Sequence, residues 1–348
     1  MKPVQFSQDE LAHNHAIEWW YWNGHLQDKQ GKRYGYMDCL FKAKPKKIKI
    51  PFIKGVPAET LYFSHSLVTD IKRKNFYPRI DYVSLVSKDS FSKTLLNINY
   101  INPIIVNGYF NNVMQKIERG HYYLKTEDIE LHLYSKKKPL LEDGSGYLRL
   151  PNSRSTYYYS LTNLKTEGKI RVGKKWIEVT GKSWMDHQWA NVKYEKDKWT
   201  WFSIQLDNNT EIVCIEFGNK KQYRLASVSY PNNKQKHTRN VNFTPLGKQW
   251  KSQKTKAEYP LEWKIEIPEF NIALTAKALV KQQEMLFGTI NYWEGPLDIK
   301  GEMDGKKVSG VAFSELVGYP SELNNIKFIR KTFREAIGMG ITYIKKKI

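Results

Sequence analysis

One stretch of this chain carries signals of both fold and chemistry: Gly181-Lys182-Ser183-Trp184-Met185-Asp186-His187-Gln188-Trp189-Ala190. It follows the run Trp176-Ile177-Glu178-Val179-Thr180, whose alternating apolar and polar side chains predict a β-strand. If this strand continues without a bulge, its period of two divides the side chains between two faces. Met185, His187 and Trp189 then share one face, and Trp184, Asp186 and Gln188 share the other.

His187 would thus share its face of the strand with an indole ring. Such a wall can hold an apolar ligand beside a group that moves a proton near neutral pH. The same residue types also form structural clusters, in which Asp186 caps a turn and both indoles fill the core. Spacing alone leaves both interpretations open, and the structural one is the more common.

A second aromatic segment lies near the start of the chain: Glu18-Trp19-Trp20-Tyr21-Trp22-Asn23-Gly24-His25-Leu26. A polar loop with one glycine separates it from the β-prone run 33–41, and this pattern predicts a β-hairpin. Parity places Glu18, Trp20 and Trp22 on one side of the strand and Trp19, Tyr21 and His25 on the other. Four adjacent aromatic residues cannot all lie on one face, so each face must meet apolar protein or ligand.

Most of the remaining chain reads as short strands between turns. In the predicted strand 61–70, His65 has the parity of Phe63 and is expected to point inward. Such a histidine is either a hydrogen-bonded core residue or part of a cavity wall.

A firm hairpin is predicted around Asn208-Asn209, because asparagine tolerates positive φ. It joins the runs 199–206 and 210–217. In the second run, Glu216 has the parity of Cys214, so we expect a buried carboxyl with a raised pKa.

Two later acidic residues, Glu294 and Glu315, lie next to or close to a glycine near predicted strand ends. A carboxylate at such a place can accept backbone N–H bonds at a turn. We therefore expect both residues to be structural.

Composition limits the class of protein. The 348 residues carry a formal net charge of +21, which favours association with anionic surfaces. The lysines are scattered and no nucleic-acid reading module is recognisable, so nucleic-acid binding is not expected. The cysteines, Cys39 and Cys214, lie far apart in sequence, so no disulfide framework is expected. Without a signal peptide or an apolar run of transmembrane length, a cytoplasmic location is expected.

Several reaction classes are disfavoured. The sequence has no glycine-rich phosphate loop in strand–turn–helix context and no Gly-x-Ser-x-Gly elbow. It also lacks the Cys/His spacing of common metal sites. We therefore expect no cofactor and no metal.

Five motifs in consistent order resemble a known family. They are Glu18-Trp-Trp-Tyr-Trp-Asn-Gly-His-Leu26, Phe63-Ser-His-Ser-Leu67, Thr180-Gly-Lys-Ser-Trp-Met-Asp-His-Gln-Trp189, Trp201-Phe-Ser-Ile-Gln-Leu206, and Tyr292-Trp-Glu-Gly295 with Glu315-Leu-Val-Gly-Tyr319. Together, over about Glu10 to Tyr319, they resemble the AttH-like proteins and the carotenoid 1,2-hydratases. The resemblance implies an all-β fold of two lipocalin-like antiparallel β-barrels side by side. We predict an N-terminal barrel domain at 1–192, a C-terminal one at 198–320, and a basic amphipathic helical tail at 321–348.

The resemblance also implies a site. In the hydratases the His and Trp of the Asp-His-x-Trp motif are the catalytic candidates, and His187 and Trp189 match them. An acid and a tyrosine on a following strand complete the family's site; Glu216 matches the acid, but Cys214 stands where the tyrosine is usual. The predicted catalytic residues are Asp186, His187, Trp189 and Glu216. The predicted ligand-binding residues are Glu18, Trp19, Trp20, Tyr21, Trp22, His65, Trp184, Trp201 and Tyr292.

The predicted partner is an extended hydrophobic molecule of isoprenoid, acyl or polyketide type, held between the barrels. Its conversion would be cofactor-independent acid–base chemistry, such as hydration or cyclisation of an alkene. Asp186, Glu216 or His187 would donate the proton, and indole faces would stabilise the developing cation. The alternative function is a non-catalytic carrier of the same kind of ligand.

The tail adds a membrane hypothesis. Apolar residues follow helical spacing at Leu323, Ile326, Ile329, Phe333 and Ile337, with basic residues between them and Lys345-Lys346-Lys347 after them. Such a helix either packs on its own barrel or lies on an anionic membrane, where each lysine contributes on the order of 1 kcal/mol. If it binds a membrane, the full chain should float with anionic liposomes in low salt, and a chain ending at Pro320 should not. Equal flotation of the two forms, or none, would remove the tail as an anchor.

Overall fold

The computed structural model describes residues 2–6, 8–44, 59–91, 95–102, 112–191, 197–218, 222–287 and 290–319. Within these ranges the regular elements are β-strands, apart from two short 3-10 turns, η1 (Glu142–Gly144) and η2 (Pro268–Phe270). The predicted all-β class is therefore confirmed. The predicted helical tail at 321–348 lies outside the described residues. No helix in the described part is long and apolar enough to cross a membrane.

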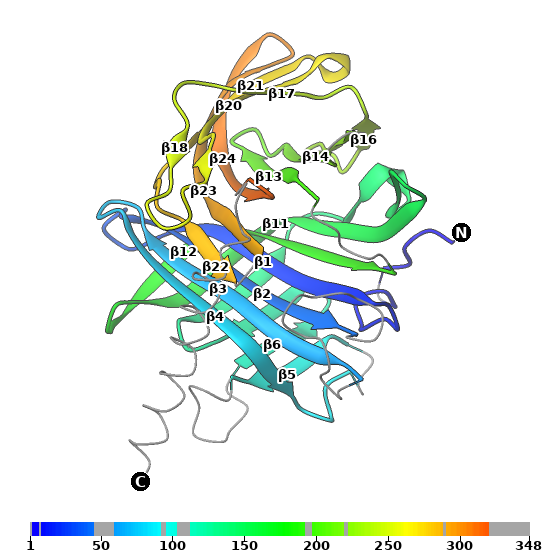
Figure 1. The fold of residues 1–348 in the computed structure, drawn as a ribbon, viewed down its shortest axis with the longest axis vertical. Coiled ribbons are helices and arrows are strands. Elements are labelled where there is room, and N and C mark those ends of the chain that lie inside the picture. Colours follow the sequence, from blue (N-terminus) through cyan, green and yellow to red (C-terminus); the bar gives the residue numbers. More distant parts are fainter. Residues whose placement is uncertain are drawn as a thin grey trace.

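The first sheet is a closed barrel (Figure 1). Its strands are β1 (Ile17–Gln27), β2 (Arg33–Ala43), β3 (Leu61–Asp70), β4 (Asn75–Val86), β5 (Asn97–Ile101), β6 (Asn112–Glu118), β7 (His121–Lys125), β8 (Ile129–Ser135), β11 (Arg154–Val172) and β12 (Lys175–Ala190). Strand β11 pairs antiparallel with both β12 and β8, which closes the ring. The short strands β9 (Leu140–Leu141) and β10 (Tyr147–Leu150) add to β11 outside the ring.

The second sheet is open. In spatial order it contains β16 (Gln235–Thr238), β15 (Tyr223–Ser229), β14 (Glu211–Phe217), β13 (Trp199–Leu206), β24 (Lys306–Val317), β23 (Ile290–Met303), β21 (Ile272–Ala278), β20 (Glu262–Ile267) and β17 (Asn242–Pro245), with β22 (Glu284–Phe287) paired to β23. A separate ribbon pairs β18 (Trp250–Lys251) with β19 (Glu258–Tyr259). Where a second barrel was expected, this sheet is a curled half-barrel, because its four-residue end strands β16 and β17 do not pair with each other in the described part.

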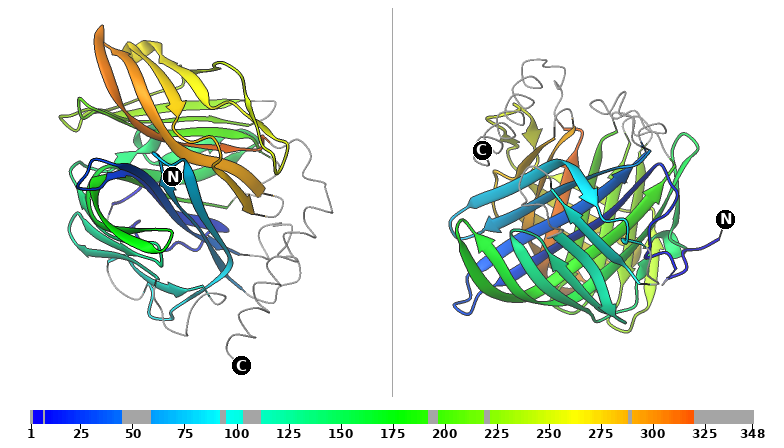
Figure 2. Two further views of the ribbon diagram at one scale, coloured as in Figure 1. Left: turned by 90° about the vertical axis from the view of Figure 1, so that its left-hand side faces the viewer. Right: turned by 90° about the horizontal axis from the view of Figure 1, so that it is seen from below.

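The second sheet lies against one wall of the barrel (Figure 2). We call the buried layer between them the seam. Its apolar members come from both sheets: Tyr21, Met37, Cys39, Leu67, Leu148, Tyr158, Trp184, Trp201, Val213, Phe217, Tyr223, Leu225, Met285, Tyr292, Phe313 and Val317. Residues 20–24 of β1 and 183–187 of β12 are thus covered on both faces, by the barrel core and by the seam. This double burial explains why β1 carries adjacent aromatic residues on both sides.

The barrel strands span residues 17–190 and the second sheet spans 199–317. The hairpins predicted around Asn208-Asn209 and between 18–26 and 33–41 are present. Whether the two sheets fold as separate domains with the predicted boundaries stays a prediction.

Gly181 allows β1 and β12 to approach closely. A Cβ atom there would lie 2.1 Å from the carbonyl oxygen of His25 and 2.9 Å from the Cα atom of Leu26, both in the backbone of β1. Because backbone atoms cannot move aside like a flexible side chain, any larger residue must separate the two strands.

We therefore expect Gly181→Ala to lower the free energy of unfolding by about 2 kcal/mol or more. The exposed neighbour Thr180 provides the control, and Thr180→Ala should change it by less than about 0.5 kcal/mol. Urea unfolding followed by tryptophan fluorescence measures both. Equal stability of the two variants would contradict a tight contact at this position.

Candidate functional site

The two aromatic motifs meet because β1 and β12 are antiparallel neighbours. In their register Trp20 lies opposite His187, and Tyr21 lies opposite Asp186. The rings of Trp20 and His187 stack, with centroids 4.9 Å apart. The two aromatic motifs are therefore in direct contact.

The predicted residues nevertheless divide between two sites, because alternate side chains point to opposite faces. Glu18, Trp20, Trp22, His187 and Trp189 face the barrel interior. Tyr21, His65, Trp184, Asp186, Trp201 and Tyr292 lie in the seam, and Trp19 is half-buried beside it. The barrel face and the seam face have to be considered separately.

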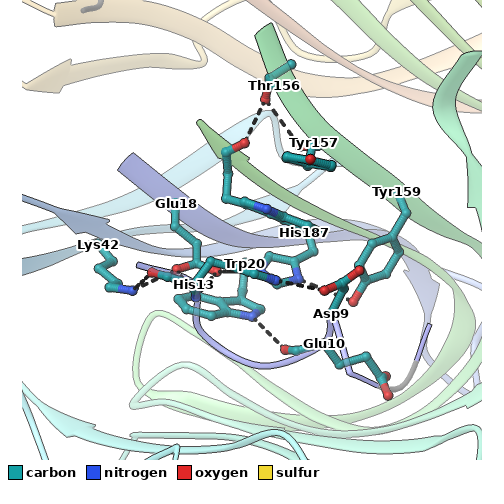
Figure 3. Close-up of polar contacts among 11 residues, drawn as sticks. Asp9, Glu10, His13, Glu18, Trp20, Lys42, Thr156, Tyr157, Tyr159 and His187 are labelled. Atoms are coloured by element: carbon teal, nitrogen blue, oxygen red, sulfur yellow. Dashed lines mark hydrogen bonds and ion pairs between the residues drawn. The ribbon is translucent and has the colours of Figure 1, made fainter. Parts of the chain in front are cut away.

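On the barrel face, Glu18 is the centre of a hydrogen-bonded cluster (Figure 3). Its Oε1 atom accepts from His187 Nε2 at 2.9 Å and from His13 Nδ1 at 2.8 Å. Its Oε2 atom accepts from Lys42 Nζ at 2.9 Å. Burial opposes the charge, but the bonds from both histidines, with the charges of His187 and Lys42, lower the pKa of Glu18 to about 2. Glu18 is therefore an ionised acceptor.

His187 is completely buried, and burial lowers its pKa although Glu18 opposes this. Its Nδ1 atom lies 3.3 Å from the hydroxyl of Tyr159. On the side of Trp189, the His13 ring stacks on the indole with centroids 3.8 Å apart and planes 5° apart. The cluster is thus held by aromatic faces as well as by hydrogen bonds.

Sequence reasoning missed the contribution of the segment before β1. His13 comes from this segment, and its Nε2 atom lies 3.2 Å from Asp9 Oδ1. Glu10 is buried beside them, where it accepts a hydrogen bond from Tyr122 at 2.5 Å and forms an ion pair with Lys116. The signal was the density of acidic residues and histidines ahead of β1, but no periodicity relates them to that strand.

In the seam, Asp186 is enclosed by donors. Its carboxylate accepts from Ser160 Oγ and Trp184 Nε1, each at 2.6 Å, and from the hydroxyl of Tyr158 at 2.8 Å. Tyr158 in turn accepts from Trp201 Nε1 at 2.9 Å. Burial raises the pKa of Asp186 to about 7, although these bonds oppose the rise.

Glu294 and Glu315 are also in the seam. They lie opposite each other on the paired strands β23 and β24. Tyr21 donates its hydroxyl to Glu294 Oε1 at 2.7 Å, and Trp199 Nε1 donates to Glu315. For Glu294 the expectation of a turn is wrong, because β23 continues through Gly295 without turning. Glu315 does lie near a strand end, because β24 ends at Val317.

These two carboxyls are coupled. Burial raises the pKa of Glu294 well above its ordinary value, and the charge of Glu315 raises it further. Burial also raises the pKa of Glu315, whereas its bonds to Trp199 and Glu294 oppose this. Two adjacent carboxyls in a buried site share a proton, because both cannot ionise cheaply.

The aromatic residues of the seam join the two sheets. His65 Nδ1 on β3 lies 2.6 Å from the hydroxyl of Tyr292 on β23. Burial lowers the pKa of His65 to about 3, so the ring is neutral near pH 7. His65 is inward, as its parity predicted, but it faces the seam and not the barrel core.

Glu216 is not brought into the seam. It shares the face of Cys214, which packs in the core on the other side of the second sheet. Its carboxylate is half-buried and forms an ion pair with Arg224 at 2.7 Å. The expectation of a fully buried carboxyl is wrong, because Glu216 lies near the end of β14 with Arg224 directly opposite on β15.

Three potential metal ligands also meet on the barrel face. The ligand atoms of His13, Glu18 and His187 all lie within 4.8 Å of one another. The spacing rules could not find this set, because its members come from three separate segments.

Comparisons with known proteins agree with this architecture. A family model described as AttH-like matches residues 1–319. Kievitone hydratase from Fusarium solani subsp. phaseoli is 25% identical over 293 residues, covering 76% of this chain and 80% of that protein. Dehydratase asqC from Emericella nidulans is 24% identical over 224 residues, covering 60% of this chain and 62% of that protein. The solved structure of a putative AttH from Nitrosomonas europaea has a TM-score of 0.71 at 21% identity, covering 91% of this chain and 98% of that one.

The raised pKa values of Glu294 and Glu315 predict a pH dependence of stability. A carboxyl whose folded pKa exceeds its unfolded value stabilises the fold fully at low pH, and this stability is lost as the pH rises. Between the unfolded and folded pKa values, each such proton makes stability fall by about 1.4 kcal/mol per pH unit.

Glu294→Gln should therefore flatten the decline in stability from about pH 5 to pH 8. Urea unfolding at several pH values measures this slope, with Glu216→Gln as the matched control outside the seam. Parallel curves for wild type and Glu294→Gln would show that Glu294 holds no such proton.

Proposed function

Because this chain belongs to the AttH-like family, we propose that it adds water to, or removes water from, an apolar small molecule held in the seam. Two relatives bear names of this reaction type, one a hydratase and the other a dehydratase. The site is the layer between the barrel and the second sheet, where most of the predicted ligand-binding aromatic residues gather.

The observation that carries the proposal is the pairing of Glu294 with Glu315. Hydration and dehydration both need an acid and a base close together. A carboxyl pair that shares one proton supplies both, with the protonated member as the acid and the ionised member as the base; here Glu294 is fully buried and Glu315 is half-buried. Tyr21, bonded to Glu294, fixes the position of this pair relative to the barrel wall.

In the hydration direction, Glu294 transfers its proton to one carbon of an alkene. The oxygen of a water molecule bonds to the other carbon, and Glu315 accepts the proton that this water loses. The proton then returns from Glu315 to Glu294 through their mutual contact, which restores the starting state. Dehydration is the reverse sequence.

The walls of the seam suit an apolar substrate and a cationic intermediate. Trp184 and Trp201 present indoles there, and both have their N–H groups bound by neighbouring oxygens. Aromatic faces stabilise positive charge and carry no basic atom that would take a proton from the cation. Asp186 supplies a third carboxyl on the barrel wall of the seam.

The reaction can be tested with kievitone as the probe in H2(18)O, following incorporation of the heavy oxygen by mass spectrometry. We expect turnover by the wild type and a loss of about 100-fold or more in Glu294→Gln and Glu315→Gln. Glu216→Gln is the matched control and should keep its rate, because Glu216 faces away from the seam.

Ligand binding, measured by quenching of tryptophan fluorescence, distinguishes the alternatives. A carrier would bind the probe in all variants without incorporating oxygen. Turnover by Glu294→Gln and Glu315→Gln at the wild-type rate would overturn the assignment of the carboxyl pair.

A further inference from the structure

The cluster on the barrel face has the composition of a metal centre. His13 Nδ1 and His187 Nε2 converge on the same oxygen of Glu18, at 2.8 and 2.9 Å. Two imidazoles and one carboxylate are the protein ligands of several catalytic zinc sites and of non-haem iron sites. Metal–ligand bonds of about 2.0–2.2 Å need these atoms to separate only slightly.

The outer contacts of these ligands match those of metal sites. A metal-binding histidine usually has its second ring nitrogen held by a carboxylate, a carbonyl or another polar group. Here Asp9 Oδ1 lies 3.2 Å from Nε2 of His13, and the hydroxyl of Tyr159 lies 3.3 Å from Nδ1 of His187. Both rings therefore direct their other nitrogen at Glu18, as Figure 3 shows.

Aromatic stacking fixes the same rings. His13 lies flat on the indole of Trp189, and His187 stacks on Trp20. Glu18 and His187 are fully buried, whereas the side chains of His13 and Asp9 are 16% and 26% exposed. The site is thus rigid on its inner side and open to ion entry through the segment before β1.

Charge is the main opposing influence. Lys42 bonds to Glu18 and would repel a dication. It occupies Oε2, however, while both histidines converge on Oε1. The second carboxylate, Asp9, offsets the added charge.

We propose that His13, Glu18 and His187 bind one divalent transition-metal ion of the Zn²⁺ type. Each neutral imidazole carries its ring proton on the outer nitrogen, towards Asp9 or Tyr159, and coordinates the ion through the nitrogen that faces Glu18. Three protein ligands leave a fourth position for water. The ion also ties the segment before β1 to the barrel wall. This site is separate from the carboxyl pair. It lies on the barrel face of β1 and β12, whereas the pair lies in the seam on their other face.

The test uses the purified full chain after chelator treatment and dialysis. Titration with Zn²⁺ against a chromophoric zinc indicator gives the affinity and the number of ions bound, and Co²⁺ gives visible absorption bands that report the ligand geometry. We expect one ion per chain in the wild type and loss of this binding in His13→Ala. Asp9→Asn should weaken it by about 10- to 100-fold, since Asp9 holds the outer nitrogen of a ligand.

His237→Ala is the control, because His237 lies on β16 beside Ser227 and not in this cluster. It should bind Zn²⁺ like the wild type, and Lys42→Gln should bind it more tightly because a repelling charge is removed. Circular dichroism checks that His13→Ala is folded; if it is not, the comparison of Asp9→Asn with Lys42→Gln decides. Absence of Zn²⁺ binding by the wild type, or equal binding by all these variants, would overturn the proposal and leave a hydrogen-bonded cluster only.

Discussion

The structure depends on one constraint, the pairing of β1 with β12 where residues 20–24 and 183–187 are buried on both faces. Their register sets Trp20 against His187 on the barrel side and Tyr21 against Asp186 on the seam side. Within residues 20–24 and 183–187 the polar side chains are buried, so each must find its partners within the protein. The hydrogen-bonded groups around Glu18 and around Asp186 both follow from this requirement.

The two faces solve the requirement in different ways. On the barrel face, Glu18 meets Lys42 and two imidazoles and is held ionised. In the seam, Glu294 meets the hydroxyl of Tyr21 and a second carboxyl, so it retains its proton. Two fully buried acidic side chains, Glu18 and Glu294, thus have pKa values shifted in opposite directions, because their partners differ in charge.

The alternation of residues in the sequence was enough to predict much of this arrangement. It placed Trp20 and Tyr21 on opposite faces of one strand and Asp186 and His187 on opposite faces of another. Hydrophobic periodicity and turn residues identified the main hairpins. The alternation could not tell which face would meet the barrel core and which the second sheet, because a period of two is the same for both. Glu294 was misjudged because Gly295 was taken as a strand end, whereas it lies within the continuous strand β23.

Other features were outside the reach of pattern reasoning. His13 belongs to no periodic element, and only the folded chain brings it to Glu18. Glu216 followed the apolar parity of its strand, but its carboxylate forms an ion pair with Arg224, which lies opposite it on β15 near the end of β14. A local sequence pattern describes the strand on which a residue lies. The contacts of these two residues are instead set by a neighbouring strand or segment.

The seam has a consequence for how proteins of this architecture can change. Tyr21 and Asp186 come from the barrel, whereas Glu294, Glu315 and Trp201 come from the second sheet. The surface that joins the two halves is therefore also the surface on which the proton-bearing groups assemble. Neither half carries all of these groups. Exchanging one half between relatives would therefore replace some of the groups and also change the packing between the halves. Divergence in this architecture must proceed by matched changes on both sides of the join, and the halves behave as one inherited unit.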